Sequence, residues 1–278
     1  MNKESKRVEL NEMRTVATKL FNENHSAWAS PTASEKDLIF YLLCKKFLNH
    51  INSLHFVLQG TDFNDIIPGT EQLDHPTAKV ILRAAFETYL TIAHHYWNEA
   101  VSHDLRILIY KHSGVSERLA LPVNDGESDI IRRKRHDHAL KRDKLEQDIR
   151  QLGQELGISN KHLNQSLKTG WRAGNSWTKI GCNSSLADHY VQSVYPYLCG
   201  YSHSGYESCI QLGEDEGLCF EEKIQNQEIL FVFSSYLIAK FCESFYSYSA
   251  SKGCSSEVDM NSVVTLVSFY DRAFASRA

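Results

Sequence analysis

The chain has 278 residues, of which 42% are hydrophobic and 23% are charged, a composition typical of one large globular domain or two small ones. Its formal net charge of −4 gives no overall attraction to nucleic acid and leaves only local basic patches for that purpose. Seven cysteines occur singly, without a CxxC pair, which argues against a disulfide framework or a cysteine zinc site and favours a reducing compartment.

The N-terminal segment, MNKESKRVELNEMR, is charged and lacks the apolar stretch of a signal peptide. No apolar run reaches the roughly 20 residues that a bilayer-spanning helix needs. From these two observations we expect a cytoplasmic protein without a membrane partner.

Helical periodicity dominates the first part of the chain, where three helices are predicted, over residues 3–21, 35–58 and 77–98. Ser34 is expected to cap the second helix and Asp74 the third, while Gly60 ends the second. The apolar side of the first helix is predicted to consist of Leu10, Met13, Ala17 and Leu20, with Val16 on its flank. The apolar face of the second is predicted to consist of Leu38, Tyr41, Leu42, the stem of Lys45, Leu48 and Ile51.

Residues 77–98 form the stretch around which the rest of the chain is expected to be organised. More than half of the helix circumference is apolar, which is typical of a helix packed on several sides. Arg83, Glu87, Leu90 and His94 share one stripe. The stripe has two interpretations: a solvent face with a weak Arg83–Glu87 pair of about 0.2–0.5 kcal/mol, or the wall of a cleft in which the two charges orient a ligand or a partner side chain.

Six further helices are predicted in the second part of the chain, separated by a turn at residues 122–126, an irregular segment at 168–183 and a connection at 213–217. Residues 129–156 are strongly charged with a thin apolar seam, and we name them the charged arm. The predicted helices are 102–119, the charged arm, 159–167, one that starts at Ser184 or Ser185 and bends or restarts at Pro196, 221–248, and one that starts at Ser255 or Ser256.

A second polar stretch covers residues 195–206, YPYLCGYSHSGY. In a continuous helix it would align Tyr195, Cys199, Ser202, His203 and Tyr206 on one side. A histidine among hydroxyl groups is suited to general acid–base catalysis, because its proton is shared near neutral pH and hydroxyls fix its tautomer. The alternative is a structural histidine that is hydrogen-bonded within a helix interface.

The two polar stretches together resemble a bacterial family of unknown function. In that family an R-x-x-x-E helix precedes a Y-x-x-L-S-x-x-x-H helix, and this chain has Arg83 and Glu87 followed by Tyr195, Leu198 and His203. The match spans residues 76–212 and departs at Cys199, where the family commonly has serine. The resemblance implies an all-helical fold with Arg83, Glu87 and His203 close together, and it implies no established reaction.

Other known types of site are largely excluded by the sequence. The chain contains no Glu-x-x-His pair, HExxH motif, P-loop, G-x-S-x-G or G-x-G-x-x-G, so neither a metal nor another cofactor is expected. His94, His95 and Glu99 lack a second cluster that would complete a metal site. The pair Arg133 and His138 has the spacing of HEPN-type ribonucleases, but arginine and histidine are dense in the charged arm and a solvated face explains them more simply.

These patterns predict one all-α, multi-helix domain over residues 1–278 with the charged arm projecting from it. Residues 77–98 are expected to pack on residues 185–206 and 221–248. The leading functional hypothesis is an intracellular bacterial effector that acts on RNA or a nucleotide. In it Arg83, Glu87 and His203 are the catalytic residues, and Tyr195, Tyr201, Ser202, His94 and Arg133 line the binding surface.

Two alternatives to this leading hypothesis remain. In the first, the chain is a non-catalytic helical subunit of a bacterial defence or toxin–antitoxin assembly, paired with itself or with a partner. In the second, it binds nucleic acid through the arginines of the charged arm. The sequence decides neither whether the protein is an enzyme nor its oligomeric state.

Overall fold

The structure of the chain is a computed structural model, and it describes residues 3–61, 64–68, 73–98, 102–123, 128–203 and 205–275. Within these ranges the chain forms twelve α-helices and one π-helical turn, and no strand. The predicted all-α, multi-helix class is therefore confirmed.

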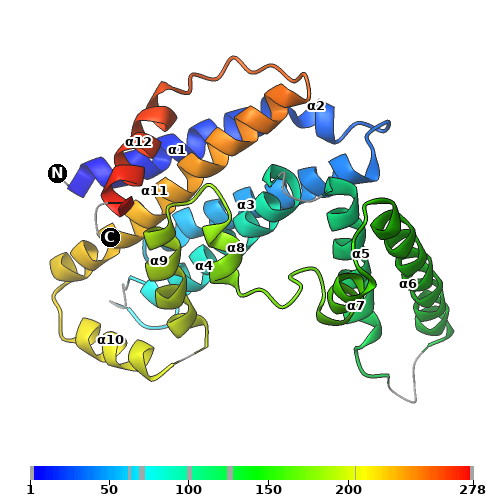
Figure 1. The fold of residues 1–278 in the computed structure, drawn as a ribbon. Coiled ribbons are helices and arrows are strands. Elements are labelled where there is room, and N and C mark those ends of the chain that lie inside the picture. Colours follow the sequence, from blue (N-terminus) through cyan, green and yellow to red (C-terminus); the bar gives the residue numbers. More distant parts are fainter. Residues whose placement is uncertain are drawn as a thin grey trace. The chain divides into compact units, whose positions relative to one another are not determined.

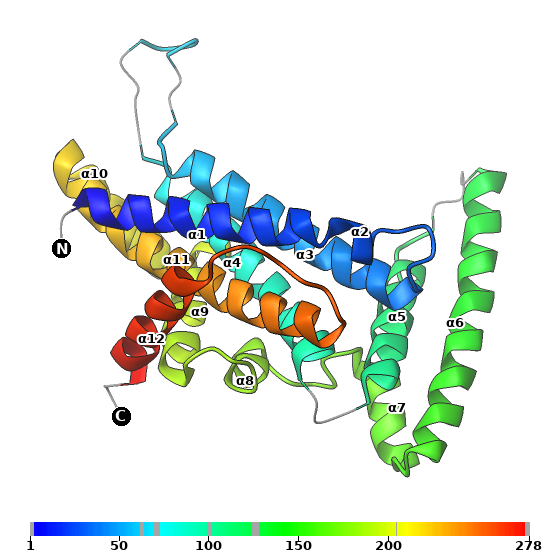
Figure 2. The same ribbon diagram turned by 90° about the horizontal axis from the view of Figure 1, so that it is seen from above.

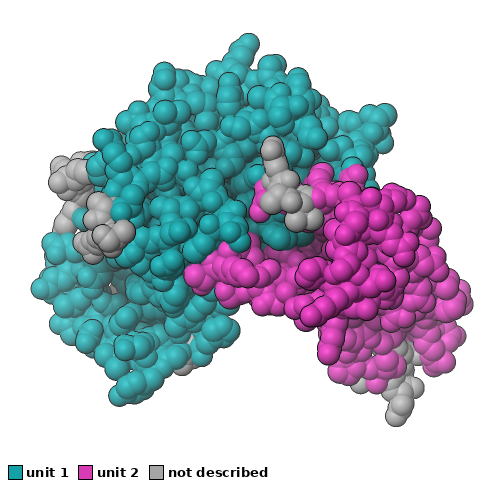
Figure 3. All heavy atoms as spheres, in the orientation of Figure 1, with its two compact units in different colours: residues 1–97, 181–278 teal, residues 98–180 magenta. Residues whose placement is uncertain are grey.

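The helices gather into two compact units, which Figure 3 colours separately. Unit 1 consists of residues 1–97 and 181–278, and unit 2 of residues 98–180. Unit 1 is built from two distant parts of the chain, with unit 2 inserted between them in sequence. A compact unit need not fold independently, so the single domain over residues 1–278 stays a prediction.

Unit 1 contains eight α-helices and the π-helical turn, in the arrangement of Figures 1 and 2. They are α1 (Lys3–Glu23), α2 (His25–Trp28), α3 (Glu35–Val57), α4 (His75–Ile92), the π-helical turn (Ala93–Trp97), α9 (Asp188–Ser202), α10 (Tyr206–Glu216), α11 (Phe220–Ser251) and α12 (Asn261–Ala275). Unit 2 contains α5 (His103–Leu119), α6 (Asp129–Glu155) and α7 (Asn160–Thr169), and the short α8 (Trp177–Cys182) crosses the boundary between the units.

The predicted helix caps explain why α3 and α4 begin where they do. Ser34 forms a capping box with Asp37: each side chain accepts a hydrogen bond from the backbone N–H of the other residue. The carboxylate of Asp74 accepts the backbone N–H of Thr77 at 3.0 Å, and Pro76 lies in the first turn of α4, where its missing N–H costs nothing.

Helix α4 lies at the centre of unit 1, as its apolar circumference predicts. It packs against α9 and α11, the two predicted partners, and also against α3. Aromatic rings fill the space between these helices, with Phe47 stacked on Phe241 at 4.4 Å and Phe86 stacked on Tyr190 at 5.7 Å between centroids. Such pairs contribute roughly 0.5–1.5 kcal/mol each beyond their buried area.

Helices α1 and α11 run side by side in Figures 1 and 2, and α12 packs on α11 and α9. The predicted apolar side of α1 is fully confirmed, because Leu10, Met13, Ala17 and Leu20 are each at most 2% exposed. The prediction for α3 is partly wrong, since Leu38 and Leu42 are 44% and 52% exposed. The buried face of α3 is rotated toward Phe40, Cys44 and Phe47.

The segment 221–251 of α11 has the length and the apolar composition of a membrane-spanning helix. In the fold, 67% of the most apolar 18-residue window of this segment is buried. A core helix that is covered on most sides has the same composition, and α11 packs against α1, α4 and α12.

Unit 2 is a small helical unit in which α6 packs on both α5 and α7. Its core consists of Leu105, Ile149 and Leu163, one from each helix. Helix α6 corresponds to the charged arm, and most of its surface charges form pairs within the helix, such as Arg150 with Glu146 at 2.7 Å. These pairs are those of a solvated helix face.

Several predicted boundaries are wrong, for identifiable reasons. The segment 168–183 is not wholly irregular, because it contains α8. Helix α9 starts at Asp188, since the hydroxyl of Ser184 donates to Gly181 O and that of Ser185 pairs with Tyr89. The helix continues through Pro196 with neither a break nor a restart.

Two more boundaries differ near the C-terminus. Gly213 lies inside α10, so the predicted connection 213–217 is helical for most of its length. Helix α12 starts at Asn261, where Asp259 accepts its backbone N–H at 2.9 Å. The hydroxyl of Ser256, one of the two predicted caps, donates to the carboxylate of Glu23 on α1. The start of α12 is therefore satisfied locally by Asp259, while the predicted cap Ser256 is engaged in a tertiary contact with α1.

Candidate functional site

Arg83, Glu87, Tyr195 and His203 form one hydrogen-bonded group in unit 1, which we name the Arg83 cluster. The first two lie one turn apart on α4, and the other two lie on α9 and at its C-terminal end. Arg83 Nε donates to Glu87 Oε1 at 2.9 Å, and Arg83 Nη1 lies 3.2 Å from His203 Nε2. The hydroxyl of Tyr195 donates to the same Oε1 of Glu87 at 2.9 Å.

The antiparallel packing of α4 and α9 brings these residues together although 120 positions separate Arg83 from His203. The guanidinium of Arg83 also lies over the Tyr195 ring, 5.7 Å from its centroid. Arg83 thus contacts every other member of the cluster. Because a guanidinium has no acceptor, its contact with His203 requires Nε2 of the imidazole to accept, which puts the imidazole proton on Nδ1.

The cluster is half open to solvent. The side chains of Arg83 and Glu87 are 17% and 27% exposed, and His203 is exposed. Burial lowers the pKa of Arg83, but the hydrogen bond that Arg83 donates to the Tyr195 oxygen and the charge of Glu87 outweigh it and raise the pKa above its ordinary value. Arg83 is therefore a permanent cation that meets solvent on one side.

Tyr195 stays protonated over the whole physiological range. Burial and its hydrogen bonds with Cys199 and Glu87 raise the pKa of the phenol well above 10. The phenol is thus a fixed donor to Glu87 and holds this carboxylate toward Arg83. Cys199 is close enough to interact with the phenol.

The remaining predicted binding residues occupy different positions. Ser202 is half-buried and donates its hydroxyl to Leu198 O, while Tyr201 donates to Gln211 on α10. His94 is half-buried in the π-helical turn, beyond the last turn of α4, and Leu90 of the same stripe is fully buried. The stripe is therefore polar and open only around Arg83 and Glu87.

Arg133 lies on α6 in unit 2 and its side chain is exposed. Its neighbour Arg135 donates to the backbone oxygens of Leu119 and Leu121 at the end of α5, at 2.9 and 3.2 Å. Arg135, one of the charged-arm arginines considered for nucleic-acid contact, is therefore already used within the unit. Tyr206, which was expected on the same face as His203, lies on α10 after the end of α9.

A pocket that the sequence did not indicate lies one turn before the Arg83 cluster on α4. We name it the Lys79 pocket. It has a volume of about 240 Å³. Its lining residues come from α4, α9, α10 and α11: His75, Lys79, Tyr197, Tyr201, Gln211, Glu214, Asp215, Asn226 and Ile229. The sequence signal of this site is Lys79 within an apolar stretch. This signal is weak, because most lysines in proteins are exposed to solvent.

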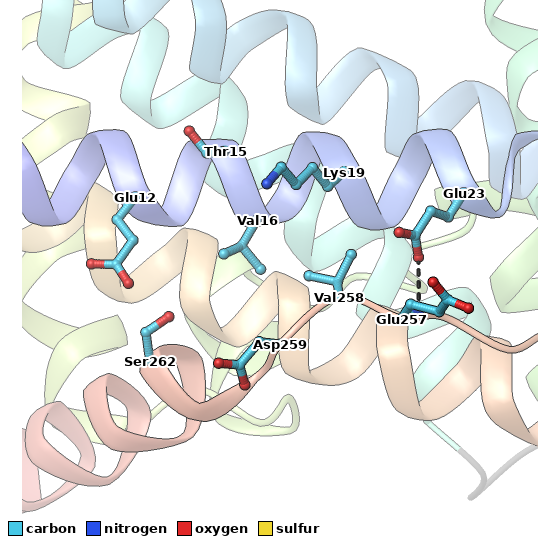
Figure 4. Close-up of a pocket in the computed structure, with 9 residues that line it drawn as sticks. All are labelled: Glu12, Thr15, Val16, Lys19, Glu23, Glu257, Val258, Asp259 and Ser262. Carbon is cyan, nitrogen blue, oxygen red and sulfur yellow. Dashed lines mark hydrogen bonds between the residues drawn. The ribbon is translucent and has the colours of Figure 1, made fainter.

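A shallow groove of about 530 Å³ follows α1 and is shown in Figure 4. Glu12, Lys19 and Glu23 come from α1, while Glu257 and Asp259 come from the connection before α12 (Figure 4). The dashed line in the figure is the hydrogen bond of 3.2 Å from the Glu257 backbone N–H to the Glu23 carboxylate. This bond and that from Ser256 fasten the connection to α1.

Metal-binding geometry is not found in the described part of the chain, where no three histidine, cysteine, aspartate or glutamate side chains are placed to hold an ion. Of the three residues considered as metal ligands in the sequence, His94, His95 and Glu99, the last lies outside the described residues.

No protein-family model matches the chain, and no match to it was found among curated proteins or among solved structures. The resemblance to a bacterial family of unknown function therefore stays a prediction. The function has to be argued from the side chains and their geometry alone.

Proposed function

We propose that the chain is an intracellular bacterial effector whose Arg83 cluster binds a phosphate group of RNA or of a nucleotide. The observation that carries the proposal is the position of Arg83, held by Glu87 and facing the exposed imidazole of His203. A guanidinium pairs well with phosphate oxygens because its N–H groups form a planar fork. Glu87 accepts from Nε, so the Nη groups are the ones that would contact a phosphate, with Nη1 exchanging its contact with His203 for it.

His203 is the general acid–base in this proposal. In the absence of ligand its Nε2 accepts from Arg83, so the proton of the neutral imidazole is on Nδ1. A phosphate that takes over the Nη groups of Arg83 frees Nε2 to accept a proton from a hydroxyl or a water molecule. Glu87 and Tyr195 are positioning residues, because they hold the guanidinium and do not reach the ligand.

The alternative function is a non-catalytic subunit of a defence or toxin–antitoxin assembly, acting as a homodimer or with another chain. One observation favours it: the Tyr195–Glu87 hydrogen bond joins α9 to α4 and would fix the register of two core helices. In that case the Arg83 cluster is a structural network, and its loss lowers the yield of folded protein.

Growth of a bacterial host that expresses the wild type or His203→Ala tests the proposal, with soluble yield and RNA integrity recorded for both. His189→Ala is the matched control, since His189 lies on the same helix and its nearest hydrogen-bonding contact is a weak one with Ser193 at 3.5 Å. We expect His203→Ala to abolish toxicity and RNA damage at unchanged yield, and His189→Ala to retain both.

Two results would contradict the catalytic role. A sharp fall in the yield of His203→Ala would show that the imidazole supports the fold. Identical growth and RNA profiles at equal yield, together with equal binding of a labelled oligoribonucleotide by the purified proteins, would remove His203 from any reaction. Capture of partner proteins and light scattering on the purified chain would then test the assembly function.

A further inference from the structure

The Lys79 pocket contains a largely buried lysine whose amine has no carboxylate within salt-bridge distance among the described residues. Lys79 is 6% exposed, and its Nζ lies 3.6 Å from the centroid of the Tyr201 ring and 5.0 Å from that of Tyr197. Within the described residues it has neither a salt bridge nor a hydrogen bond. Ring faces stabilise an ammonium group less than a direct carboxylate partner and water would.

The same helix face carries a second unusual group. His75 lines the pocket one turn before Lys79, is 4% exposed, and its Nε2 has no hydrogen-bond partner in the structure. A buried polar atom without a partner calls for an explanation, and a ligand in the pocket would supply one. Lys79 and His75 are independent indications of the same site.

Burial makes the amine of Lys79 reactive. Burial lowers the pKa of Lys79 to about 8, against the opposing charge of Asp215. At pH 7 roughly one amine in ten is then neutral, about 300 times the fraction expected for a lysine at the ordinary pKa of 10.5. Burial also lowers the pKa of His75, with Asp215 again opposing it, so the imidazole is neutral at pH 7.

We propose that Lys79 is a nucleophile that forms a Schiff base with a small hydroxylated aldehyde or ketone bound in the Lys79 pocket. Its nitrogen lone pair attacks the carbonyl carbon, and the C–O π electrons move to oxygen. Transfer of one proton from nitrogen to that oxygen gives a carbinolamine, and loss of water leaves the C=N bond. In this proposal His75, which lines the same pocket and whose Nε2 has no hydrogen-bond partner, carries these protons. No oxidant or reductant is needed.

The lining of the pocket selects this class of ligand. Glu214 and Asp215 disfavour an anionic compound, whereas Gln211, Asn226 and the two carboxylates offer hydrogen bonds to hydroxyl groups. Burial raises the pKa of both Tyr197 and Tyr201, that of Tyr201 to about 12, so the phenols stay neutral. The volume of about 240 Å³ lies below the roughly 300–1,000 Å³ of drug-sized ligand sites, which favours a small molecule.

The experiment is site-resolved labelling of the purified full chain with glycolaldehyde and sodium cyanoborohydride, followed by peptide mapping. The chain offers a matched control in Lys240, which is 5% exposed but forms salt bridges with Glu243 at 3.1 Å and Asp271 at 3.2 Å. Lys168 on α7 is the exposed reference. At pH 7 we expect Lys79 to react at least ten times faster than Lys168, and Lys240 to react more slowly than Lys168.

Two further measurements separate a ligand site from a merely reactive amine. The rate at Lys79 should reach half its maximum near pH 8, and glycolaldehyde should outpace acetaldehyde, which lacks a hydroxyl, at Lys79 but not at Lys168. Asp215→Asn removes the charge that raises the pKa of Lys79, so it should increase labelling at pH 7 severalfold. His75→Phe should slow labelling severalfold without moving its pH midpoint.

The proposal is overturned if Lys79 reacts no faster than Lys168 at pH 7, or if its rate keeps rising to pH 10 as that of an ordinary lysine does. It is also overturned if glycolaldehyde and acetaldehyde label Lys79 equally, since the pocket then recognises no hydroxyl group. Circular dichroism of each variant confirms that the fold is retained. The outcome does not depend on the Arg83 cluster, because His203→Ala leaves every residue of the Lys79 pocket in place.

Discussion

The hydrogen bond between Tyr195 and Glu87 offers a quantitative test of how α9 is held on α4. In Tyr195→Phe the ring remains and keeps its contact with Phe86, 5.8 Å away between centroids, while the hydroxyl is lost. The lost bond is 2.9 Å long and its acceptor is a carboxylate, a type that contributes about 1.5–3 kcal/mol when buried. The Glu87 side chain is 27% exposed and keeps Arg83 as a partner, so water replaces part of the interaction. We therefore expect a loss of about 1 kcal/mol.

Urea denaturation followed by circular dichroism measures this loss. A double-mutant cycle with Glu87→Ala isolates the pair, because alanine removes the acceptor and the effects that each substitution has independently of the other cancel. We expect a coupling energy of about 1 kcal/mol. A coupling energy below about 0.3 kcal/mol, which is the usual error of additivity, would show that the hydrogen bond does not hold the helices together. Equal unfolding slopes for all four proteins would confirm that the same transition is compared.

Three further changes should give distinct results. Gly153→Ala favours the α6 helix locally by about 1 kcal/mol, but the added Cβ would lie 2.6 Å from the buried Leu163 side chain. We therefore expect the free energy of unfolding, measured by urea denaturation, to fall by about 1–2 kcal/mol. An increase in stability would contradict the packing of α6 on α7. Arg135→Ala should lower the free energy of unfolding by about 1 kcal/mol, because the hydrogen bonds to the end of α5 are lost. Arg133 is exposed, so Arg133→Ala should leave stability unchanged. Equal effects of the two substitutions would show that the Arg135 bonds are not formed. Stability should fall as pH rises above about 10. Burial raises the pKa of Tyr201 to about 12 and raises the pKa of other buried tyrosines likewise, so the unfolded chain loses its phenolic protons before the folded chain does. Equal urea midpoints at pH 10 and pH 11.5 would refute this.

The sequence predicted the helical elements well because their signals are local. A capping serine or aspartate and a 3.6-residue apolar period depend only on neighbouring residues, and Ser34, Asp74 and the buried side of α1 are found as expected. The boundaries failed where a distant residue bound the side chain of a serine that was predicted to cap a helix. Ser185 pairs with Tyr89, and Ser256 donates to Glu23, so neither serine starts a helix.

The buried face of α3 marks a second limit of periodicity. The apolar residues Leu38 and Leu42 fit a helical stripe with Tyr41 and Leu48, yet they are exposed because α4 and α11 cover the other side of the helix. A hydrophobic period states which residues share a face. It does not state which of two apolar faces the neighbouring helices will cover.

The two candidate sites differ in how far the sequence indicated them. The order of charges on α4 and the histidine at the end of α9 indicated the Arg83 cluster in advance, because spacing alone aligned Arg83 with Glu87 and the resemblance implied His203 beside them. The Lys79 pocket was decided only by tertiary structure. Its amine meets the Tyr201 ring across 122 positions of sequence. A lysine acquires its reactivity from burial, and burial is set by which helices pack around it rather than by the residues next to it in the chain.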